Sequence, residues 1–303
     1  MKATILHKLI LYSLPFMLTS CEKDFLIDEF LGDNKTTVNC LFDKENQFKI
    51  FVTQSSHPTQ NTSTIAPQDV WIELFENDSL VGVVPYIPAN AANSFGSYNT
   101  TYIPIEGKKY ALKVARPGLP LVTAQDTMPT SPQVINYKVS AYTTTPTQSN
   151  VQFSFTLSDQ NPNQHDYYRI QTFHSYSLWV KTSPNDSSLK HFYEYIQPSN
   201  LSPLADIIDD HGWSYLFSDK DFNGLTKNIT TGFQSLDTTK LTALTVHLDI
   251  IKVSQNHWNY FQTLEKFNNS NKETDPAPVF SNIANGYGIF MSQNIKRLSV
   301  QIK

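Results

Sequence analysis

The sequence contains only two cysteines, Cys21 and Cys40, and 10 glycines among 303 residues. Two cysteines exclude a disulfide-rich scaffold, because such frameworks pair four or more. Charged residues make up only 17% of the chain, and Lys and Arg form no cluster of the kind that binds nucleic acid. We therefore expect a fold that is held by an apolar core, and no nucleic-acid partner.

Two further absences concern membranes and catalysis. No run of roughly 20 apolar residues is present, the length that a membrane-spanning helix needs. The sequence also lacks a Gly-x-Ser-x-Gly nucleophile elbow, a His-Glu-x-x-His zinc pair and a three-glycine dinucleotide loop. Asn285-Gly286-Tyr287-Gly288 precedes an expected strand, so we interpret it as a tight turn. These absences predict a protein that is not an enzyme and that has no cofactor and no metal ion in a catalytic role.

What is present begins with a secretory signal peptide. After a basic start, residues 9–18 are apolar apart from Ser13, and small residues follow. This run is too short to span a bilayer. It ends in Leu18-Thr19-Ser20-Cys21, which resembles the bacterial lipobox, where the cysteine carries the lipid and becomes the first mature residue. We predict a lipoprotein signal peptide over residues 1–20, lipidation at Cys21 and a tether over residues 21–35.

A lipid on Cys21 predicts attachment to the outer membrane, because several acyl chains together anchor a protein stably. Glu22-Lys23-Asp24 resembles the short acidic signal, with a lysine, that sends Bacteroidetes lipoproteins to the outer face of that membrane. We therefore expect the cell exterior, with the periplasmic face as the alternative. Once Lys2 and Lys8 leave with the leader, 21 basic side chains oppose 27 acidic ones, a net charge of −6.

Strand-like alternation of apolar and polar residues begins at residue 36. In Thr36–Phe42 it places Cys40 on one face with Val38 and Phe42, so we expect Cys40 to be a small core residue rather than a nucleophile. The expected strands cover residues 36–43, 48–55, 69–76, 80–86, 98–105 and 109–115. Short strands separated by turn signals predict an immunoglobulin-like β-sandwich. Pro129 and Pro132 mark its end, so the first domain is predicted over 36–130.

A second, larger β-rich domain is predicted over residues 131–303. Its expected strands cover residues 133–144, 150–158, 166–181, 189–197, 213–218, 226–233, 242–253, 287–291 and 295–302. One amphipathic helix is expected at about 254–268. Ser254 is a suitable N-cap, and Trp258, Phe261 and Leu264 follow at helical spacing. The fold class is therefore mainly β with one helix near the C-terminus.

Several segments together resemble a known family. They are the lipobox with its acidic start, Tyr110-Ala-Leu-Lys-Val, Thr123-Ala-Gln-Asp-Thr-Met-Pro129, Phe155-Thr-Leu-Ser-Asp159, Tyr167-Tyr-Arg-Ile170, Phe217-Ser-Asp-Lys-Asp-Phe-Asn-Gly224, Trp258-Asn259-Tyr260 and Ser281-Asn-Ile-Ala-Asn-Gly-Tyr-Gly-Ile-Phe290. The chain is similar to the Bacteroidetes lipoproteins grouped as domain of unknown function 4249. The resemblance implies an outer-membrane lipoprotein whose first domain is immunoglobulin-like or carboxypeptidase-regulatory-like, of a kind often associated with TonB-dependent transporters. It implies no activity and no catalytic residue.

Two sets of residues are candidates for binding sites. Trp179 and Trp213 are the tryptophans that we expect to be exposed, where they could stack on a sugar ring. Trp71 and Trp258 are expected to pack in the core. Asp219, Asp221 and Asn223, followed by Gly224, resemble the start of a calcium loop, but the position of the bidentate glutamate holds Thr230. The alternative for this segment is a polar turn between strands.

These observations lead to one expected function and one alternative. We expect a surface lipoprotein that assists a TonB-dependent transporter in nutrient capture and that contacts the membrane through the lipid on Cys21. The alternative is a glycan-binding or adhesive module that acts alone.

Overall fold

The computed structural model describes residues 34–55, 67–90, 95–183, 186–199, 201, 203–208, 213–270 and 277–303, without the side chains of 142–144 and 182. The signal peptide, Cys21 and Glu22-Lys23-Asp24 lie outside the described residues, so the predictions for them stay predictions. Within the described part, no helix is long and apolar enough to cross a membrane. The predicted mainly β fold with one helix near the C-terminus is confirmed.

The first lobe consists of two sheets packed face to face. One contains β1 (Thr36–Phe42), β2 (Phe48–Gln54), β6 (Ser97–Thr100) and β5 (Tyr86–Ile87), and the other contains β4 (Ser79–Val83), β3 (Trp71–Glu76), β7 (Lys109–Ala115) and β8 (Val122–Thr127). Alternation in β1 buries Val38, Cys40 and Phe42, as expected. Phe42 stacks on Phe48 with ring centroids 4.6 Å apart. Burial raises the pKa of the Cys40 thiol, which disfavours the nucleophilic thiolate.

The second lobe is also built from two packed sheets. A three-stranded sheet of β9 (Gln133–Thr145), β10 (Gln148–Ser158) and β15 (Thr226–Gln234) covers one face of a sheet that contains β13 (Ile207–Ile208), β14 (Ser214–Ser218), β11 (Tyr167–Ser183) and β16 (Leu241–Val253). Strand β12 (Asp186–Ile196) pairs with the distal part of β11. Phe153 and Phe155 of the small sheet pack with Ile170, Leu248 and Ile250 of the large one.

The last strand, β17 (Tyr287–Gln301), belongs to both lobes. Its residues 287–292 run parallel to β1, and residues 293–301 run antiparallel to β16. The prediction of two strands separated at Ser292-Gln-Asn294 is wrong, because these three polar residues lie buried inside one continuous strand. The predicted boundary near residue 130 stays a prediction, but β17 shows that the first lobe includes residues from the end of the chain.

The polar residues in β17 are buried because other segments satisfy their hydrogen bonds. The Ser292 hydroxyl donates to Asp126 Oδ2 at 2.7 Å, and Gln293 Nε2 donates to Asp43 Oδ2 at 2.8 Å. Asn294 Nδ2 donates to the Pro129 carbonyl at 3.0 Å. The junction between the lobes is therefore a set of hydrogen bonds between residues far apart in the sequence.

The predicted helix is confirmed as α2 (Gln255–Asn268). Ser254 is its N-cap, and its Oγ accepts a hydrogen bond from the His257 amide at 3.2 Å. Trp258 is buried and stacks on Tyr167, with ring centroids 4.9 Å apart. The helix therefore covers one end of the large sheet, on the face that points away from the three-stranded sheet.

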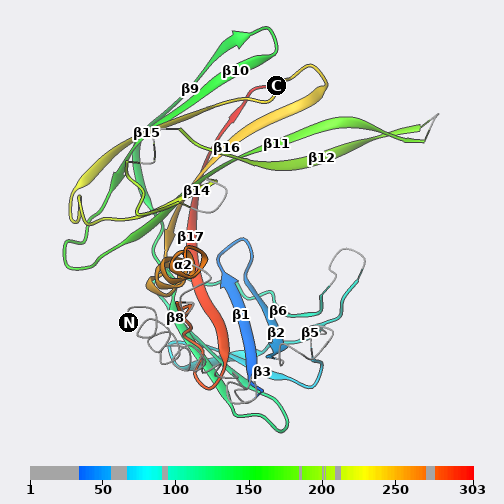
Figure 1. Cartoon of the computed structure of the whole chain (residues 1–303), viewed down its shortest axis with the longest axis vertical. Coiled ribbons are helices and arrows are strands. Elements are labelled where there is room, and N and C mark those ends of the chain that lie inside the picture. Colours follow the sequence, from blue (N-terminus) through cyan, green and yellow to red (C-terminus); the bar gives the residue numbers. More distant parts are fainter. Residues whose placement is uncertain are drawn as a thin grey trace, which may run out of the picture.

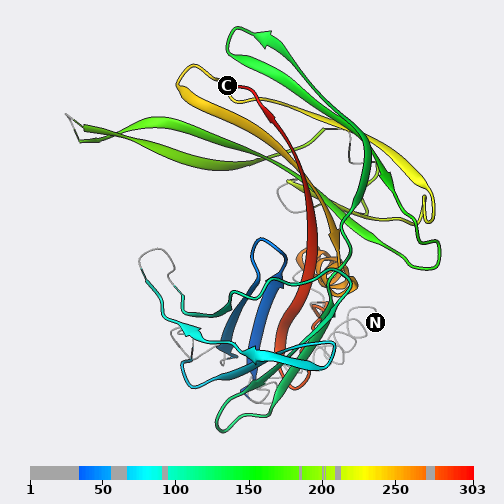
Figure 2. The ribbon, with the colours of Figure 1, turned by 180° about the vertical axis from the view of Figure 1, so that it is seen from behind.

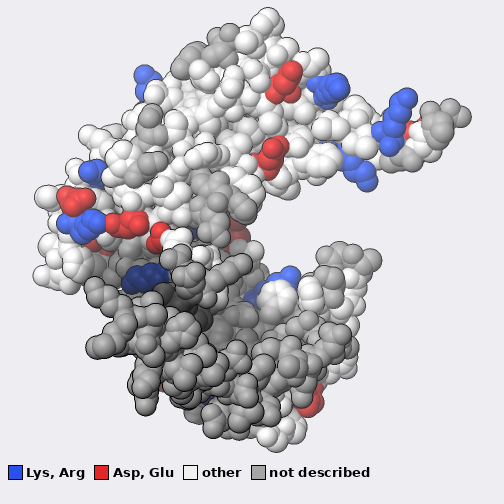
Figure 3. Space-filling model, viewed as in Figure 1, with Lys and Arg blue, Asp and Glu red and all other residues white. Residues whose placement is uncertain are grey.

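The two lobes give the molecule a C-shaped outline, with β17 passing from one lobe to the other (Figures 1 and 2). The long hairpin of β11 and β12 projects from the second lobe. In the space-filling view an open hollow lies between this hairpin and the first lobe (Figure 3). The charged side chains visible on the described part of this face are mixed in sign and scattered.

Candidate functional site

The hairpin of β11 and β12 presents a row of exposed aromatic side chains. In β11, residues of even number such as Ile170 and His174 face the three-stranded sheet and are buried. Side chains alternate along a strand, so Trp179 lies on the opposite face. The register pairs Trp179 with Leu189, Ser175 with Tyr193 and Phe173 with Tyr195, which places these β12 residues on the same face. The same face of the large sheet carries Arg297, which lies 3.4 Å from Glu45 of the first lobe, so this face is turned toward that lobe.

Three aromatic rings on this face of the hairpin are open to solvent, and so is Trp213, which precedes β14. The exposed fractions are 61% for Trp179, 76% for Tyr193, 49% for Tyr195 and 41% for Trp213. Trp213 stacks on Tyr195 with ring centroids 6.0 Å apart and an interplanar angle of 18°. We call Trp179, Tyr193, Tyr195 and Trp213 the aromatic face. Trp179 and Trp213 are exposed, as expected from the sequence.

The other two tryptophans take different positions. Trp258 is buried on the helix, as expected. Trp71 was expected in the core, but it is 56% exposed, because Ile72 and Leu74 occupy the buried face of β3 and Trp71 points the other way. Its indole Nε1 donates to Glu73 on the same side of the strand. Trp71 lies in the first lobe, on a different sheet from the aromatic face.

A set of polar and aromatic contacts lies beside the aromatic face and reaches it through Phe173. Arg297 donates two hydrogen bonds to Asp249, with Nε–Oδ1 at 2.7 Å and Nη2–Oδ2 at 2.9 Å. The same guanidinium lies 5.1 Å from the ring centroid of Phe173, which stacks on His247 at 4.5 Å. The hydrogen bond to Asp249 raises the pKa of Arg297, so this residue stays charged. These contacts fix Phe173, whose ring lies 6.0 Å from Tyr195.

The face also contains a serine–histidine pair. Ser175 Oγ lies 2.7 Å from His247 Nε2, and His247 Nδ1 lies 2.8 Å from Ser299 Oγ. Burial lowers the pKa of His247, which favours neutral imidazole. A nucleophilic serine also needs amide donors for the oxyanion. Ser175 is central in a strand paired on both sides, with Tyr193 and Thr245, so its surrounding amides serve the sheet. The arrangement favours a binding surface over a hydrolytic site.

A second polar site lies where three strand ends meet. Asp159 follows β10, Asp166 precedes β11 and Asp219 follows β14, and all three side chains are buried. One carboxylate oxygen from each lies within 4.8 Å of the others. Of the residues predicted as a calcium loop, only Asp219 is part of this cluster. Asp221 is exposed and Asn223 is half-buried.

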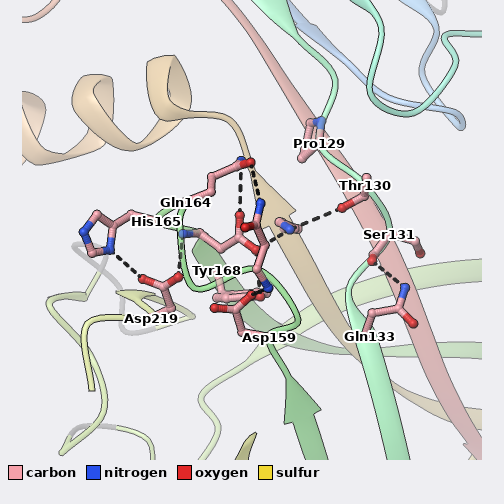
Figure 4. A network of polar contacts seen from close by, with 12 residues as sticks. Pro129, Thr130, Ser131, Gln133, Asp159, Gln164, His165, Tyr168 and Asp219 are labelled. Atoms are coloured by element: carbon pink, nitrogen blue, oxygen red, sulfur yellow. Dashed lines mark hydrogen bonds and ion pairs between the residues drawn. The ribbon is translucent and has the colours of Figure 1, made fainter. Parts of the chain in front are cut away.

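The chain itself engages each carboxylate of the cluster (Figure 4). Asp219 accepts from the Asp166 amide at 2.7 Å, and Asp159 accepts from the Gly224 amide at 2.7 Å. His165 Nδ1 lies 3.1 Å from Asp219 Oδ1. Burial raises the pKa of Asp166, while its ion pair with Lys252 acts in the opposite direction. Carboxylate oxygens are ligands that suit a hard cation. Here the backbone amides of Asp166 and Gly224 and the Lys252 ammonium group already engage these oxygens, which gives the cluster a structural role.

Lys252 connects this cluster to the junction between the lobes. Its Nζ also donates to Thr130 Oγ1 at 3.2 Å. Thr130 is next to Pro129 (Figure 4), whose carbonyl accepts the hydrogen bond from Asn294. Sequence reasoning missed Asp159, Asp166 and Lys252. The signal for the two aspartates was their position at the ends of expected strands. Nothing local pointed to their meeting with Asp219, which is more than 50 residues away.

Comparison with models of protein families gives a match over most of the chain. The family model described as Domain of unknown function (DUF4249) matches residues 22–299. Among the curated proteins, none matches the chain.

Proposed function

The chain belongs to the family described as Domain of unknown function (DUF4249), and from this premise we propose that it is a non-enzymatic, surface-exposed outer-membrane lipoprotein. It is anchored through a lipid on Cys21 and assists a TonB-dependent transporter in nutrient capture. The lipobox and the Lys-Asp start of the mature chain support the location. The observation that carries the binding role is the aromatic face beside the hollow.

Exposed aromatic rings of this kind suit recognition. Tyr and Trp are enriched in protein interfaces, and they contribute large contact area at low cost in conformational entropy. The contacts among Arg297, Asp249 and Phe173 hold the part of this surface that contains Tyr193 and Tyr195. The mixed signs of charge in Figure 3 favour a partner that is contacted mainly through apolar and hydrogen-bonding groups.

A pull-down from outer membranes in mild detergent tests the partnership. We expect an integral transporter to co-purify with the native lipoprotein. The double substitution Trp179→Ala and Tyr193→Ala should reduce the recovered transporter by at least about ten-fold, since central aromatic residues dominate interface energies. Trp71→Ala is the matched control, because it removes an exposed tryptophan from the other lobe. Recovery of the lipoprotein alone, with no transporter, would contradict the proposal.

Lipidation has its own test. Metabolic labelling with palmitate should mark the native protein and should not mark the Cys21→Ala variant. Protease treatment of intact cells should remove the anchored protein if it faces the exterior, whereas protection from protease would support the periplasmic face. Label on the Cys21→Ala variant would overturn the proposed anchor.

The second candidate function is a stand-alone glycan-binding module, favoured by the exposure of Trp179 and Trp213. Glycan-array binding that is lost in Trp179→Ala or Trp213→Ala, without any co-purified transporter, would favour this function over the first.

A further inference from the structure

A separate pocket lies in the second lobe, where β10 and β15 pair beside the segment that follows β12. Its volume is about 450 Å³, within the range of roughly 300–1,000 Å³ that small ligands occupy. The register across the two strands pairs Asn150 with Gln234, Val151 with Phe233 and Gln152 with Gly232. Ile196, Gln197 and Ser199 form the remaining wall. We call this the amide pocket.

The wall of the amide pocket is fixed to the strand that it faces. The Ser199 amide donates to the Gly232 carbonyl at 2.9 Å, and Thr231 Oγ1 donates to the Ser199 carbonyl at 2.8 Å. On the inner side, the Phe233 ring lies 5.9 Å from Phe153 and 6.1 Å from His174. The pocket is therefore formed by packed elements and needs little rearrangement to receive a ligand.

Gly232 creates part of the space. A Cβ atom at this position would lie 3.0 Å from the Val151 carbonyl oxygen and 3.7 Å from Ser199 Oγ. Gly232 does not have the left-handed backbone conformation that favours glycine at positions such as Gly224 and Gly288. Glycine at position 232 therefore leaves space in the pocket, and the backbone conformation there does not require it.

The chemistry of the lining selects a class of ligand. Its polar groups are four carboxamides and one hydroxyl, and no charged side chain contributes. A carboxamide both donates and accepts hydrogen bonds, which matches the hydroxyl groups of a sugar. An anionic or cationic ligand would find no opposite charge in this lining. The half-buried Ile196 supplies an apolar contact for a sugar ring, whereas Val151 and Phe233 point into the core, on the opposite side of the ladder from Gln152 and Gly232.

We propose that the amide pocket binds a neutral saccharide. This inference deepens the proposed function, since its biological meaning rests on nutrient capture, and it names the class of nutrient. It assigns the saccharide to Gln152 and Gln197 rather than to the aromatic face, which remains available for a protein partner.

The test uses the purified full-length lipoprotein on an array of neutral, sialylated and sulfated glycans, followed by calorimetric titration with the best neutral oligosaccharide. We expect neutral glycans to bind. The double substitution Gln152→Ala and Gln197→Ala should weaken binding by about ten-fold, because two neutral hydrogen bonds are lost. Both side chains are exposed, and Gln197 makes only a long hydrogen bond of 3.4 Å to the Tyr215 hydroxyl, so the fold should persist with a melting temperature that changes little. Gly232→Val, which fills the pocket, should abolish binding.

Gln301→Ala, an exposed glutamine on β17 outside the pocket, is the matched control and should bind as the native protein does. Three results would overturn the inference: no binding of neutral glycans, binding only of charged glycans, or binding that Trp179→Ala removes and the Gln152/Gln197 pair does not. Because no transporter is present in this assay, its failure is distinct from failure of the pull-down. A co-purified transporter without glycan binding would refute only the amide pocket.

Discussion

At the scale of single residues, buried titratable groups determine how stability responds to pH. Burial lowers the pKa of His257 to about 3 and that of His174 to about 4, and the Arg169 cation adds to the effect on His257. Burial raises the pKa of Asp126 to about 6. These shifts have opposite consequences. The histidines resist protonation that the unfolded chain accepts, whereas folded Asp126 retains a proton that the unfolded chain releases.

We predict that stability increases with pH between about 4 and about 6.5 through the two histidines, each by about 1.4 kcal/mol per pH unit at most. The stability from His257 is present above pH 6.5 and is lost as the pH falls toward about 3. The stability from Asp126 is present below pH 3.8 and is lost as the pH rises through about 6. His257→Leu should therefore flatten the profile.

Urea unfolding at several pH values measures this profile. Asp126→Asn provides the matched comparison, because it removes the opposing contribution and should make the increase with pH steeper. Parallel profiles for native protein, His257→Leu and Asp126→Asn would contradict the assignment of these two groups.

At the scale of elements, β17 depends on a close approach to β1. Gly288 pairs with Val38 in the parallel ladder and has a φ of +105°. A Cβ atom there would lie 2.1 Å from the Val38 carbonyl oxygen, which no side chain could relieve by rotating. Glycine is thus required twice, by the backbone conformation and by the contact.

We predict that Gly288→Ala lowers the free energy of unfolding by at least about 2 kcal/mol, because strain in the backbone and overlap with β1 add together. Gly107→Ala is the control. Its φ is +73° but a Cβ atom there meets open space, so about 1 kcal/mol is expected. Chemical denaturation of both variants measures the difference, and equal losses would show that the contact with Val38 has no cost.

At the scale of the whole molecule, the two lobes share strand β17, so the stability of the first lobe depends on residues from the end of the chain. Phe290 of β17 stacks on Phe42 at 4.8 Å, inside the core of the first lobe. A chain that stops at residue 130 loses this ring and the hydrogen bonds that Ser292 and Gln293 make to Asp126 and Asp43.

We predict that residues 34–130 alone do not unfold cooperatively on heating, because one sheet of the sandwich lacks its neighbour to β1. Circular dichroism during a thermal scan tests this. The same segment joined by a flexible linker to residues 277–294 should recover a sharp transition. A sharp transition of residues 34–130 by themselves would show that the first lobe is independent of β17.

Local patterns in the sequence determined much of this protein. Period-two alternation located β1, β7 and β16, because alternation needs only a few neighbouring residues. The cap at Ser254 and the spacing of Trp258 located α2 in the same way. The lipobox, which is a short linear motif, carries the prediction for Cys21.

Tertiary structure alone decided which distant segments meet. In the sequence, the polar residues Ser292-Gln-Asn294 indicate a break in a strand. They are buried in the structure because Asp126, Asp43 and Pro129, which are 165 to 250 residues away, accept their hydrogen bonds. The meeting of Asp219 with Asp159 and Asp166, the exposure of Trp71 and the amide pocket depend likewise on the order of strands in the sheets. Hydrogen bonds and packing between distant residues produce no periodic pattern in the sequence. The aspartate cluster and the amide pocket could therefore be identified only once the arrangement of the sheets was known.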